Sequence, residues 1–532
     1  MSPKIVNIVV ILTVLGLSLA VLANGMSKPL GRDEQMYCTA GVLLAQGKMI
    51  YRDFSYPSQL PYHPLLYAAL FRLLKTTYYL LVGRSVSMLC DILVLVCIVG
   101  IYRQIFESFR ISGALLGLAG AVLYVFNPLV DYANGYAWNH DVVILCIMLA
   151  FWLFISTDFQ QRSKYWRIAA IGALLTFATC MRITTALVQL LFFAAMLSQP
   201  AESIKQRFKT ALTFLIATVI VLLWPVWVIA QAPRAFFLNL YWIPKLYGKW
   251  LYEIGMVHNK VDLTLSSLSK PGYLVLILIA GYVSVMAVFV RRKFSKSHSR
   301  NLLFAALLVV TFFVIALIPP TIWAQYLAVP VPFLIISFAY PLLYMRRITS
   351  EVSRNRHFKI ASTLVAVCAV VTVISPGLGV HPMQPTVGMP SYRVALGRIS
   401  MLFDPENCVP IKLHNISKDI AEQLQTQNSK LILTLAPLFA LEGGCDIYTE
   451  LSAGAIVYRI ADRISSWNRR TTHTVGPRTL KQLIEKYPPS AVVLGVEMAV
   501  LEKSLFEAAI QPDEKNWERK VYEDGPILYL RR

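Results

Sequence analysis

The sequence predicts an α-helical polytopic membrane protein with about eleven transmembrane helices. A small α/β domain outside the membrane is predicted to follow the last of these helices. Hydrophobic residues make up 56% of the chain, charged residues only 15%, and the mean hydropathy is +0.57. A soluble protein of this composition would be covered in apolar patches. Apolar runs long enough to cross a bilayer recur as far as residue 375 and then stop, which predicts a transmembrane domain over residues 1–375.

The first of these runs is residues 6–23, preceded by Lys4. No small-residue cleavage site follows it, so we expect a retained first helix and not a removed signal peptide. The other runs that we expect to span the membrane are 84–102, 112–130, 141–157, 167–182, 183–199, 210–231, 272–290, 301–319, 322–344 and 360–375.

Basic residues gather in every second connection between these spans, near residues 103–110, 162–167, 205–209, 291–300 and 346–359. Short cytoplasmic loops collect Lys and Arg. We therefore expect a cytoplasmic N-terminus and, with an odd number of spans, an extracytoplasmic carboxyl end.

The segment after the last span has a different character. A linker with Pro and Gly is predicted over 376–390, and strand patterns at 431–435, 491–495 and 527–530 alternate with helical patterns in 391–532. Cys408 and Cys445 would bridge if this compartment is oxidising.

The net charge of +21 does not indicate nucleic-acid binding. Residues 377–532 hold 18 of the 50 basic and 17 of the 29 acidic residues, so the excess lies in the membrane half. There it indicates topology and contact with anionic membrane lipid.

Asp33 and Glu34 are adjacent acids in the first external loop, residues 24–83. Acids are scarce up to residue 376, and a carboxylate beside a bilayer needs a partner or a function. A purely structural interpretation is that Asp33 caps a helix beginning at Glu34 or Gln35.

A second long external loop, 232–271, mixes aromatic residues with Lys and is predicted, like the first, to contain interfacial helices. It would either gate the entry of a lipid or form a passive aromatic belt.

Several motifs accompany the acid pair: A-x-G-x-x-x-Y-R-D-F over residues 45–54, Pro-rich segments after it, Arg84 opening the second span, and Pro319-Pro320 with Gln325-Tyr326-Leu327 and Pro330-Val331-Pro332. Together they resemble the polyprenyl-phosphate-sugar-dependent glycosyltransferases of the GT-C fold, in particular the bacterial relatives of protein O-mannosyltransferases and lipid A aminoarabinose transferases. The resemblance covers residues 1–345. The family often has a basic residue before the Tyr, where this chain has Gln325.

The resemblance implies a hexosyl- or pentosyltransferase of the bacterial inner membrane with a periplasmic C-terminal domain. It would move a sugar from a polyprenyl-phosphate-linked donor to an envelope glycan, lipid or protein acceptor on the external face, with inversion. The attacking acceptor must lose a proton, and a carboxylate can take it. Asp33 is the candidate base, and Glu34 would orient the acceptor or hold Asp33.

The leaving phosphate requires nearby cations. The candidates are Arg84, Arg182, Arg52, Lys245 and Lys249. Each of them alternatively snorkels to the interface or pairs with Asp53 or Asp141.

Candidates for acceptor binding or for support of the catalytic residues are Tyr51, Asp53, His63, His140, Asp141 and Tyr326. A helix cap explains Asn139-His140-Asp141 equally well, and packing at the interface suits His63 better than a site role. No cofactor is predicted with certainty. A divalent cation remains open, because Asp33, Glu34, His140 and Asp141 would suit one if they converge, although no ligand spacing demands it.

Two other functions remain open. A lipid or glycan transporter or flippase would favour paired repeats and polar groups at mid-membrane, whereas only Asp91 lies well inside a span. A non-catalytic envelope-assembly protein would carry the same spans and the same external domain.

Overall fold

The computed structural model describes residues 2–532 except 162–163, 201–202, 271–272, 275, 282–284, 286–295, 320–321, 348–351, 375–398, 426, 428 and 524. The predicted linker 376–390 and most of the predicted span 272–290 lie outside the described residues. Every other predicted span consists largely of helix, with short non-helical breaks in some of them. Lipid offers no hydrogen bonds to the backbone, so each spanning segment must satisfy its own N–H and C=O groups within a helix.

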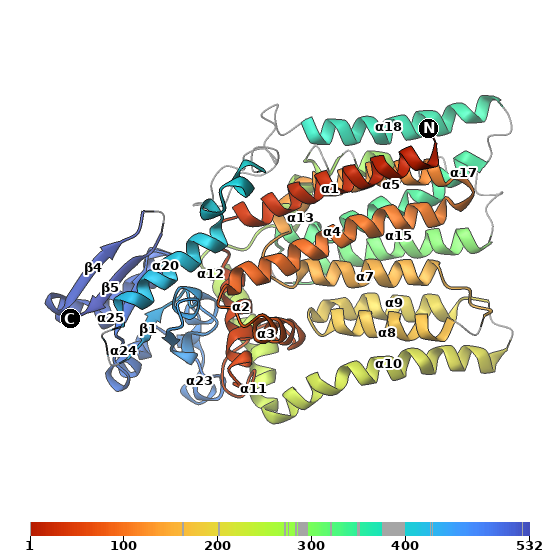
Figure 1. Cartoon of the computed structure of the whole chain (residues 1–532). Helices are drawn as coiled ribbons and strands as arrows, with labels where there is room; N and C mark the ends of the chain where they lie inside the picture. The colour runs from red at the N-terminus through yellow and green to blue at the C-terminus, as the bar shows by residue number, and fades with distance from the viewer. Residues whose placement is uncertain are drawn as a thin grey trace.

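The bundle consists of long helices that run side by side (Figure 1). Six described segments are long and apolar enough to cross a membrane, and three apolar helices of 10–17 residues accompany them. The bundle helices are α1 (Pro3–Ser27), α4 (Tyr79–Ile105), α5 (Arg110–Val125), α7 (His140–Ile155), α8 (Lys164–Thr179), α9 (Ala186–Leu197), α10 (Ile204–Gln231), α15 (Lys296–Leu317), α16 (Pro330–Ser337), α17 (Ala339–Arg347) and α18 (Val352–Ile374).

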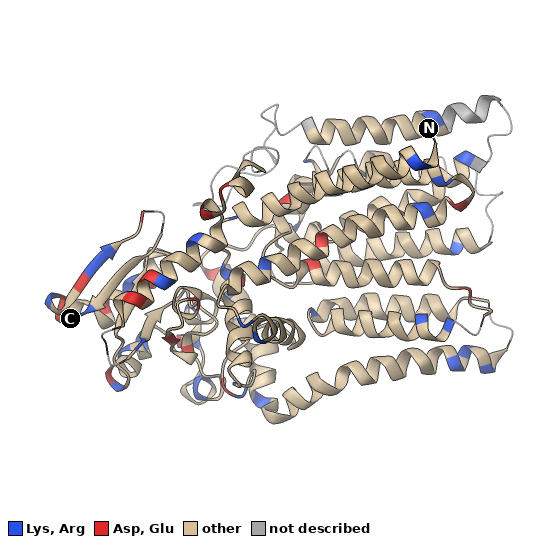
Figure 2. Cartoon of the chain, in the orientation of Figure 1, with Lys and Arg blue, Asp and Glu red and all other residues tan. Residues whose placement is uncertain are grey.

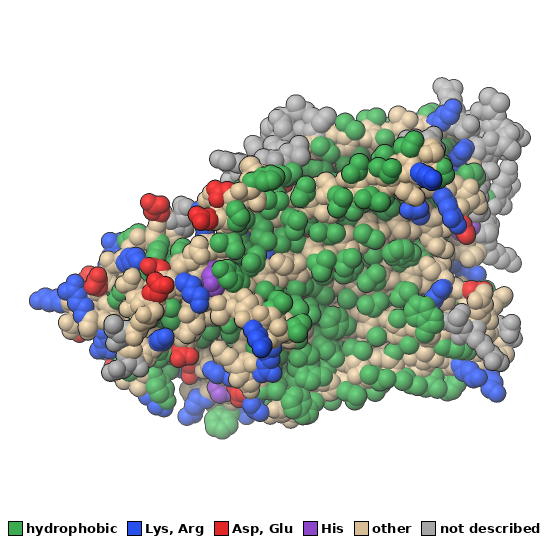
Figure 3. Space-filling model, in the orientation of Figure 1, with side chains coloured by type: hydrophobic (Ala, Val, Ile, Leu, Met, Phe, Trp, Pro, Cys, Tyr) green, Lys and Arg blue, Asp and Glu red, His purple; other side chains and the backbone are tan. Residues whose placement is uncertain are grey.

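The protein is a multi-pass membrane protein. Apolar side chains cover the flank of the bundle as a broad band (Figure 3). Outward-facing aliphatic residues such as Leu12, Val219, Leu223 and Val310 are more than half exposed. In water they would form an apolar patch far larger than soluble monomers tolerate, whereas lipid is their natural solvent.

Two predicted spans are interrupted in ways that place site residues. The chain leaves helix after α8 and turns through Arg182 into a 3₁₀ turn, η2 (Ile183–Thr185). The predicted span 322–344 begins as another 3₁₀ turn, η5 (Ala324–Leu327), and Pro330 then starts α16, where its missing N–H costs nothing. Both turns lie at the ends of bundle helices.

Short helices lie at the end of the bundle beside the C-terminal domain (Figure 1). They are α2 (Arg32–Ala45), α3 (Tyr62–Leu74), α6 (Pro128–Ala133), α11 (Pro233–Phe237), the π-helical η3 (Leu238–Trp242), α12 (Ile243–Glu253) and α13 (Lys260–Leu268). Residues 24–83 and 232–271 thus contain short helices, as expected, and their location at a membrane interface stays a prediction.

The C-terminal domain is a small α/β unit. Its sheet has the strand order β2-β1-β3-β5-β4. Strands β2, β1 and β3 are parallel to one another, β5 is antiparallel to β3, and β4 is antiparallel to β5. The strands are β1 (Leu431–Thr434), β2 (Asp446–Ile447), β3 (Ala491–Leu494), β4 (Trp517–Val521) and β5 (Ile527–Arg531), and the helices are α20 (Val409–Gln423), α21 (Leu438–Leu441), α22 (Ala455–Tyr458), α23 (Ser466–Thr472), α24 (Pro477–Lys486) and α25 (Ala499–Ala509). Cys408 and Cys445 are both free thiols.

The domain is packed onto the interfacial helices. One buried apolar cluster contains Met36 of α2, Tyr67 of α3, Leu413 of α20 and Leu438 of α21. At the border the backbone N–H of Leu80 donates to Glu442 Oε1 at 2.7 Å. The domain thus covers the end of the bundle at which α2 lies.

Lys and Arg lie at the end of the bundle that holds the N-terminus, opposite the C-terminal domain (Figure 2). From this asymmetry we predict that a reporter active only outside the cytoplasm is active when fused after Arg532. The same reporter inserted at residues 107–109, between α4 and α5, should be inactive. Reporter activity in whole cells measures both fusions, and the reverse pattern would contradict the orientation.

Candidate active site

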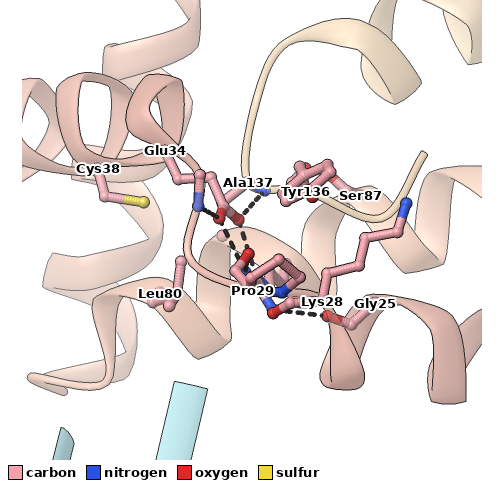
Figure 4. A network of polar contacts seen from close by, with 12 residues as sticks. Gly25, Lys28, Pro29, Glu34, Cys38, Leu80, Ser87, Tyr136 and Ala137 are labelled. Atoms are coloured by element: carbon pink, nitrogen blue, oxygen red, sulfur yellow. Dashed lines mark hydrogen bonds and ion pairs between the residues drawn. The ribbon is translucent and has the colours of Figure 1, made fainter. Parts of the chain in front are cut away.

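Glu34 and Arg84 form a buried ion pair at the junction of α2 and α4. Arg84 Nε donates to Glu34 Oε1 and Arg84 Nη2 to Glu34 Oε2, each at 2.8 Å, and both side chains are 0% exposed. Glu34 also accepts from the backbone N–H groups of Gly31 at 2.8 Å and Ala137 at 2.7 Å. Figure 4 shows this carboxylate between Ala137 and the end of α1.

The remaining donors of Arg84 hold the end of α1. Nη1 donates to the carbonyl oxygens of Gly25 and Lys28 at 2.9 and 2.8 Å, and Nη2 donates to that of Pro29 at 3.0 Å. All five N–H donors of the guanidinium are therefore occupied. A charge buried this deeply requires such complete pairing.

This geometry differs from the expected donor-phosphate role of Arg84. A phosphate could reach the guanidinium only by displacing Glu34 or the three carbonyl groups. Arg52 is similarly engaged, since Nε and Nη2 donate to the two carboxylate oxygens of Asp53 at 2.9 and 2.7 Å. Hydrogen bonding from Arg52 lowers the pKa of Asp53. Arg52 thus follows the alternative interpretation of pairing with Asp53, whereas Arg84 pairs with Glu34, a partner that the alternative did not name.

Asp33 is not the cap of its helix. Helix α2 begins at Arg32 with Gly31 as the N-cap residue, and Glu34 reaches back to the Gly31 N–H. The Asp33 carboxyl is half-buried, and burial raises its pKa to about 6. The charges of Arg459 and Arg32 oppose this rise, and Glu34 adds to it. Among the described residues the Asp33 side chain has no ion pair or hydrogen bond, and its raised pKa suits a group that exchanges a proton.

The charge of Asp33 reaches several buried tyrosines near the end of the bundle. The charges of Asp33 and Arg182 act in opposite directions on the pKa of Tyr37, which burial holds well above its ordinary value. The Arg182 guanidinium lies over the Tyr326 ring, 4.9 Å from its centre. Burial raises the pKa of Tyr247 of α12, and the charge of Asp33 adds to this rise. The charges of both Asp33 and Arg182 also act on Tyr326, although the three residues are far apart in the sequence.

The other expected site residues occupy different surroundings. Lys245 and Lys249 are exposed on α12, and Lys245 lies 5.4 Å from the centre of the Trp242 ring. Tyr51 is fully buried and donates to the Gln59 carbonyl at 2.6 Å, which makes it a support of its loop.

His63 packs edge-on against Tyr37, 4.7 Å between ring centres, and burial lowers its pKa to about 3. It is therefore neutral and a packing residue.

His140 and Asp141 begin α7 and are both buried. Asp141 Oδ2 accepts from the Gly135 N–H at 2.9 Å, which fixes the preceding loop. The charge of Arg182 reaches His140, whose Nε2 has no hydrogen-bond partner among the described residues. Within the described part of the chain, no three His, Cys, Asp or Glu side chains are placed to hold a metal ion.

One residue of the site was not among the sequence-based candidates. Arg459, at the end of α22 in the C-terminal domain, acts electrostatically on Asp33 more strongly than Arg32 does. It lies in a stretch with no motif, so only the docking of the domain reveals it.

Comparisons with known proteins bear on the fold that carries these residues. Residues 59–228 match the family of dolichyl-phosphate-mannose-protein mannosyltransferases. The crystal structure of ArnT from Cupriavidus metallidurans bound to undecaprenyl phosphate superimposes with a TM-score of 0.60 at 13% identity, covering 99% of this chain and 98% of that one. The apo form of the same protein gives 0.58 at 15% identity, with 98% and 97% covered. This protein has the GT-C fold.

The oligosaccharyltransferase of Archaeoglobus fulgidus, in complex with Zn and sulfate, matches with a TM-score of 0.51 at 11% identity and covers 98% of this chain and 73% of that one. No curated protein sequence matches the chain. The fold expected from the acid pair and its accompanying motifs is therefore confirmed, and the GT-C bundle and the C-terminal domain are matched together over almost the whole chain.

The buried pair of this GT-C protein should control stability. We predict that Glu34→Gln, which leaves the Arg84 charge buried without its partner, lowers the free energy of unfolding by about 3–5 kcal/mol. Arg84→Gln should do the same. The loss of stability in the double variant should be much smaller than the sum of the losses in the two single variants, because the two residues act as a unit. Thermal unfolding of the detergent-solubilised variants measures this, and additive losses would contradict the coupling.

Proposed function

We propose that this protein is a membrane glycosyltransferase that moves a sugar from a polyprenyl-phosphate donor to an acceptor at the face that carries the C-terminal domain. The observation that carries the proposal is Asp33, an acid with a pKa of about 6 and no ion pair or hydrogen bond among the described contacts of its side chain. Its charge acts on Tyr326, whose ring supports Arg182, at the end of a GT-C bundle. The undecaprenyl phosphate bound by the structurally similar ArnT supports a lipid-phosphate donor.

In the proposed reaction the Asp33 carboxylate accepts a proton from the acceptor hydroxyl or amine. The acceptor oxygen or nitrogen then forms a bond to the anomeric carbon of the sugar, on the face opposite the phosphate. The bond between that carbon and the phosphate oxygen breaks, and its electron pair leaves with polyprenyl phosphate. A single displacement of this kind inverts the anomeric centre.

Arg182 is proposed to meet the charge that develops on the leaving phosphate. Its backbone lies in the non-helical turn after α8, and the Tyr326 ring supports its guanidinium. Preorganised cations stabilise such charge strongly because they need no rearrangement during the reaction. The exposed Lys245 and Lys249 are placed on α12 to attract the anionic lipid.

Glu34 and Arg84 are proposed to act as positioning residues. Adjacent positions on a helix point about 100° apart, so Glu34 faces the bundle while Asp33 remains partly open to solvent. We propose a bacterial inner-membrane location with the C-terminal domain in the periplasm, where an envelope glycan, lipid or protein would be the acceptor.

We predict that Asp33→Asn lowers turnover by about 10²–10⁴-fold while leaving thermal unfolding unchanged, because it removes the base and keeps the shape. In the unmodified protein the rate should rise with pH through about 6, since the base works only when deprotonated, and should level off above. Sugar transfer by purified protein in nanodiscs measures both. Asp262→Asn, at an exposed acid of α13 on the same side, is the matched control.

Near-normal turnover of Asp33→Asn would contradict the catalytic assignment. It would favour the non-catalytic assembly role.

For Arg182 we predict that replacement by Gln weakens the binding of polyprenyl phosphate roughly tenfold, because a charged hydrogen-bond donor is lost. Lys should recover only part of the affinity, since it keeps the charge and loses the planar fork. Arg167→Gln, near the other end of α8 and also beside an aromatic ring, is the control. Equal affinity in all variants would move the phosphate site to Lys245 and Lys249.

A further inference from the structure

Arg459 reaches the candidate site because α22 is packed against the end of β1. Gly454, which precedes α22, has φ of +56°, and a Cβ atom there would lie 2.7 Å from the Leu435 carbonyl oxygen. Only glycine allows so close an approach. The Tyr458 hydroxyl is 2.6 Å from Ser504 Oγ of α25, which fixes the other end of this short helix.

The guanidinium of Arg459 lies across the border between the domain and α12. Its charge centre is 5.7 Å from the ring centre of Tyr247 and 5.3 Å from that of Trp250. Nε donates to the Ala455 carbonyl at 2.7 Å, and Nη1 is 3.5 Å from the Tyr247 hydroxyl. Nη2 is buried and has no hydrogen-bond partner among the described residues. A buried donor without a partner is costly and calls for an explanation.

The charges of two acids, Glu497 and Asp33, reach Arg459. Glu497 forms an ion pair with Arg32 at 2.8 Å. Asp33, the remaining acid whose charge reaches Arg459, makes no hydrogen bond or ion pair with it among the contacts of the described residues. Arg459 therefore contributes positive charge that no acid among the described residues neutralises by direct contact.

The part of the domain that faces the site is also suited to bind a ligand. The segments that follow the parallel strands β1 and β3 both contact α2: the Leu438 N–H donates to Gln35 Oε1 at 3.0 Å, and Glu497 pairs with Arg32. Open parallel sheets bind ligands beyond the carboxyl ends of their strands. In this chain that edge lies over the helix that carries Asp33.

We propose that Arg459 is an anion-binding residue that the C-terminal domain contributes to the active site, where its free Nη2 donates to a phosphate oxygen of a substrate. The proposal rests on the glycosyltransferase function proposed above. The phosphate belongs either to the lipid donor or to a phosphorylated acceptor, and in both cases the same forked guanidinium recognises it. Arg182 would then meet a substrate from the bundle and Arg459 from the domain.

The test compares the unmodified protein with Arg459→Gln, Arg459→Lys and Arg463→Gln in nanodiscs. Arg463→Gln is the matched control, because it removes a charge at the same border but lies in an ion pair with Glu253. Two probes distinguish the two sources: polyprenyl phosphate alone, and inorganic phosphate added after polyprenyl phosphate has saturated its site. Equilibrium binding of each probe is measured together with thermal unfolding.

We expect Arg459→Gln to weaken the binding of one probe roughly tenfold or more, and Arg459→Lys to weaken the binding of the same probe less. Arg463→Gln should leave this binding unchanged. Weaker binding of polyprenyl phosphate would show that Arg459 binds the phosphate of the donor. Weaker binding of inorganic phosphate alone would show that it binds the phosphate of the acceptor. The pH profile gives an independent readout: the midpoint near pH 6 should move upward in Arg459→Gln, because the charge that lowers the pKa of Asp33 is gone.

Normal binding of both probes by Arg459→Gln would overturn the proposal. If Arg459→Gln does not fold, the affinity of Arg459→Lys for the two probes is the deciding measurement. Full affinity of that variant, which lacks the forked guanidinium, would also contradict the proposal. If the unmodified protein fails to bind polyprenyl phosphate, the donor assignment in the proposed function fails, and inorganic phosphate alone still tests Arg459.

Discussion

The buried ion pair between Glu34 and Arg84 is the interaction on which the arrangement of the site depends. One guanidinium joins the end of α1, the start of α2 and the second turn of α4, and the carboxylate adds the loop before α7 through the Ala137 N–H. Removing two charges from water is expensive, so the pair is stable only while every donor and acceptor is satisfied. That requirement fixes the position of α2 and therefore that of Asp33, one residue before Glu34.

Two neighbouring acids acquire opposite roles from this geometry. Glu34 is fully buried, paired and structural, whereas Asp33 has no carboxylate-binding partner among the described contacts and a pKa of about 6. Burial without a partner makes ionisation of Asp33 costly, and the arginines nearby limit that cost. A base with a pKa close to physiological pH is well matched to proton abstraction.

The C-terminal domain is joined to the short helices at the end of the bundle by packing and by charge. Its core is continuous with the apolar cluster of α2 and α3, and ion pairs from Arg32 and Arg463 fasten it to α2 and α12. The charge of Arg459 consequently acts on Asp33 across the border between the domain and α2. In the proposed function the domain therefore contributes positive charge to the site.

The sequence by itself determined the membrane class, the helices of the described spans, the short helices of the two long loops and the α/β domain. Segment length, apolar composition and hydrophobic periodicity are local properties of the chain. It also singled out Asp33. It did not predict the ion pair between Arg84 and Glu34, and it left the pairing of Arg52 with Asp53 open. It also did not predict that the charge of Arg459 would act on Asp33. Those outcomes depend on which charged groups the fold brings within a few ångströms of one another, and a single sequence carries no distance between residues hundreds of positions apart. The tertiary structure alone decided which cations are paired and which remain free to bind a substrate.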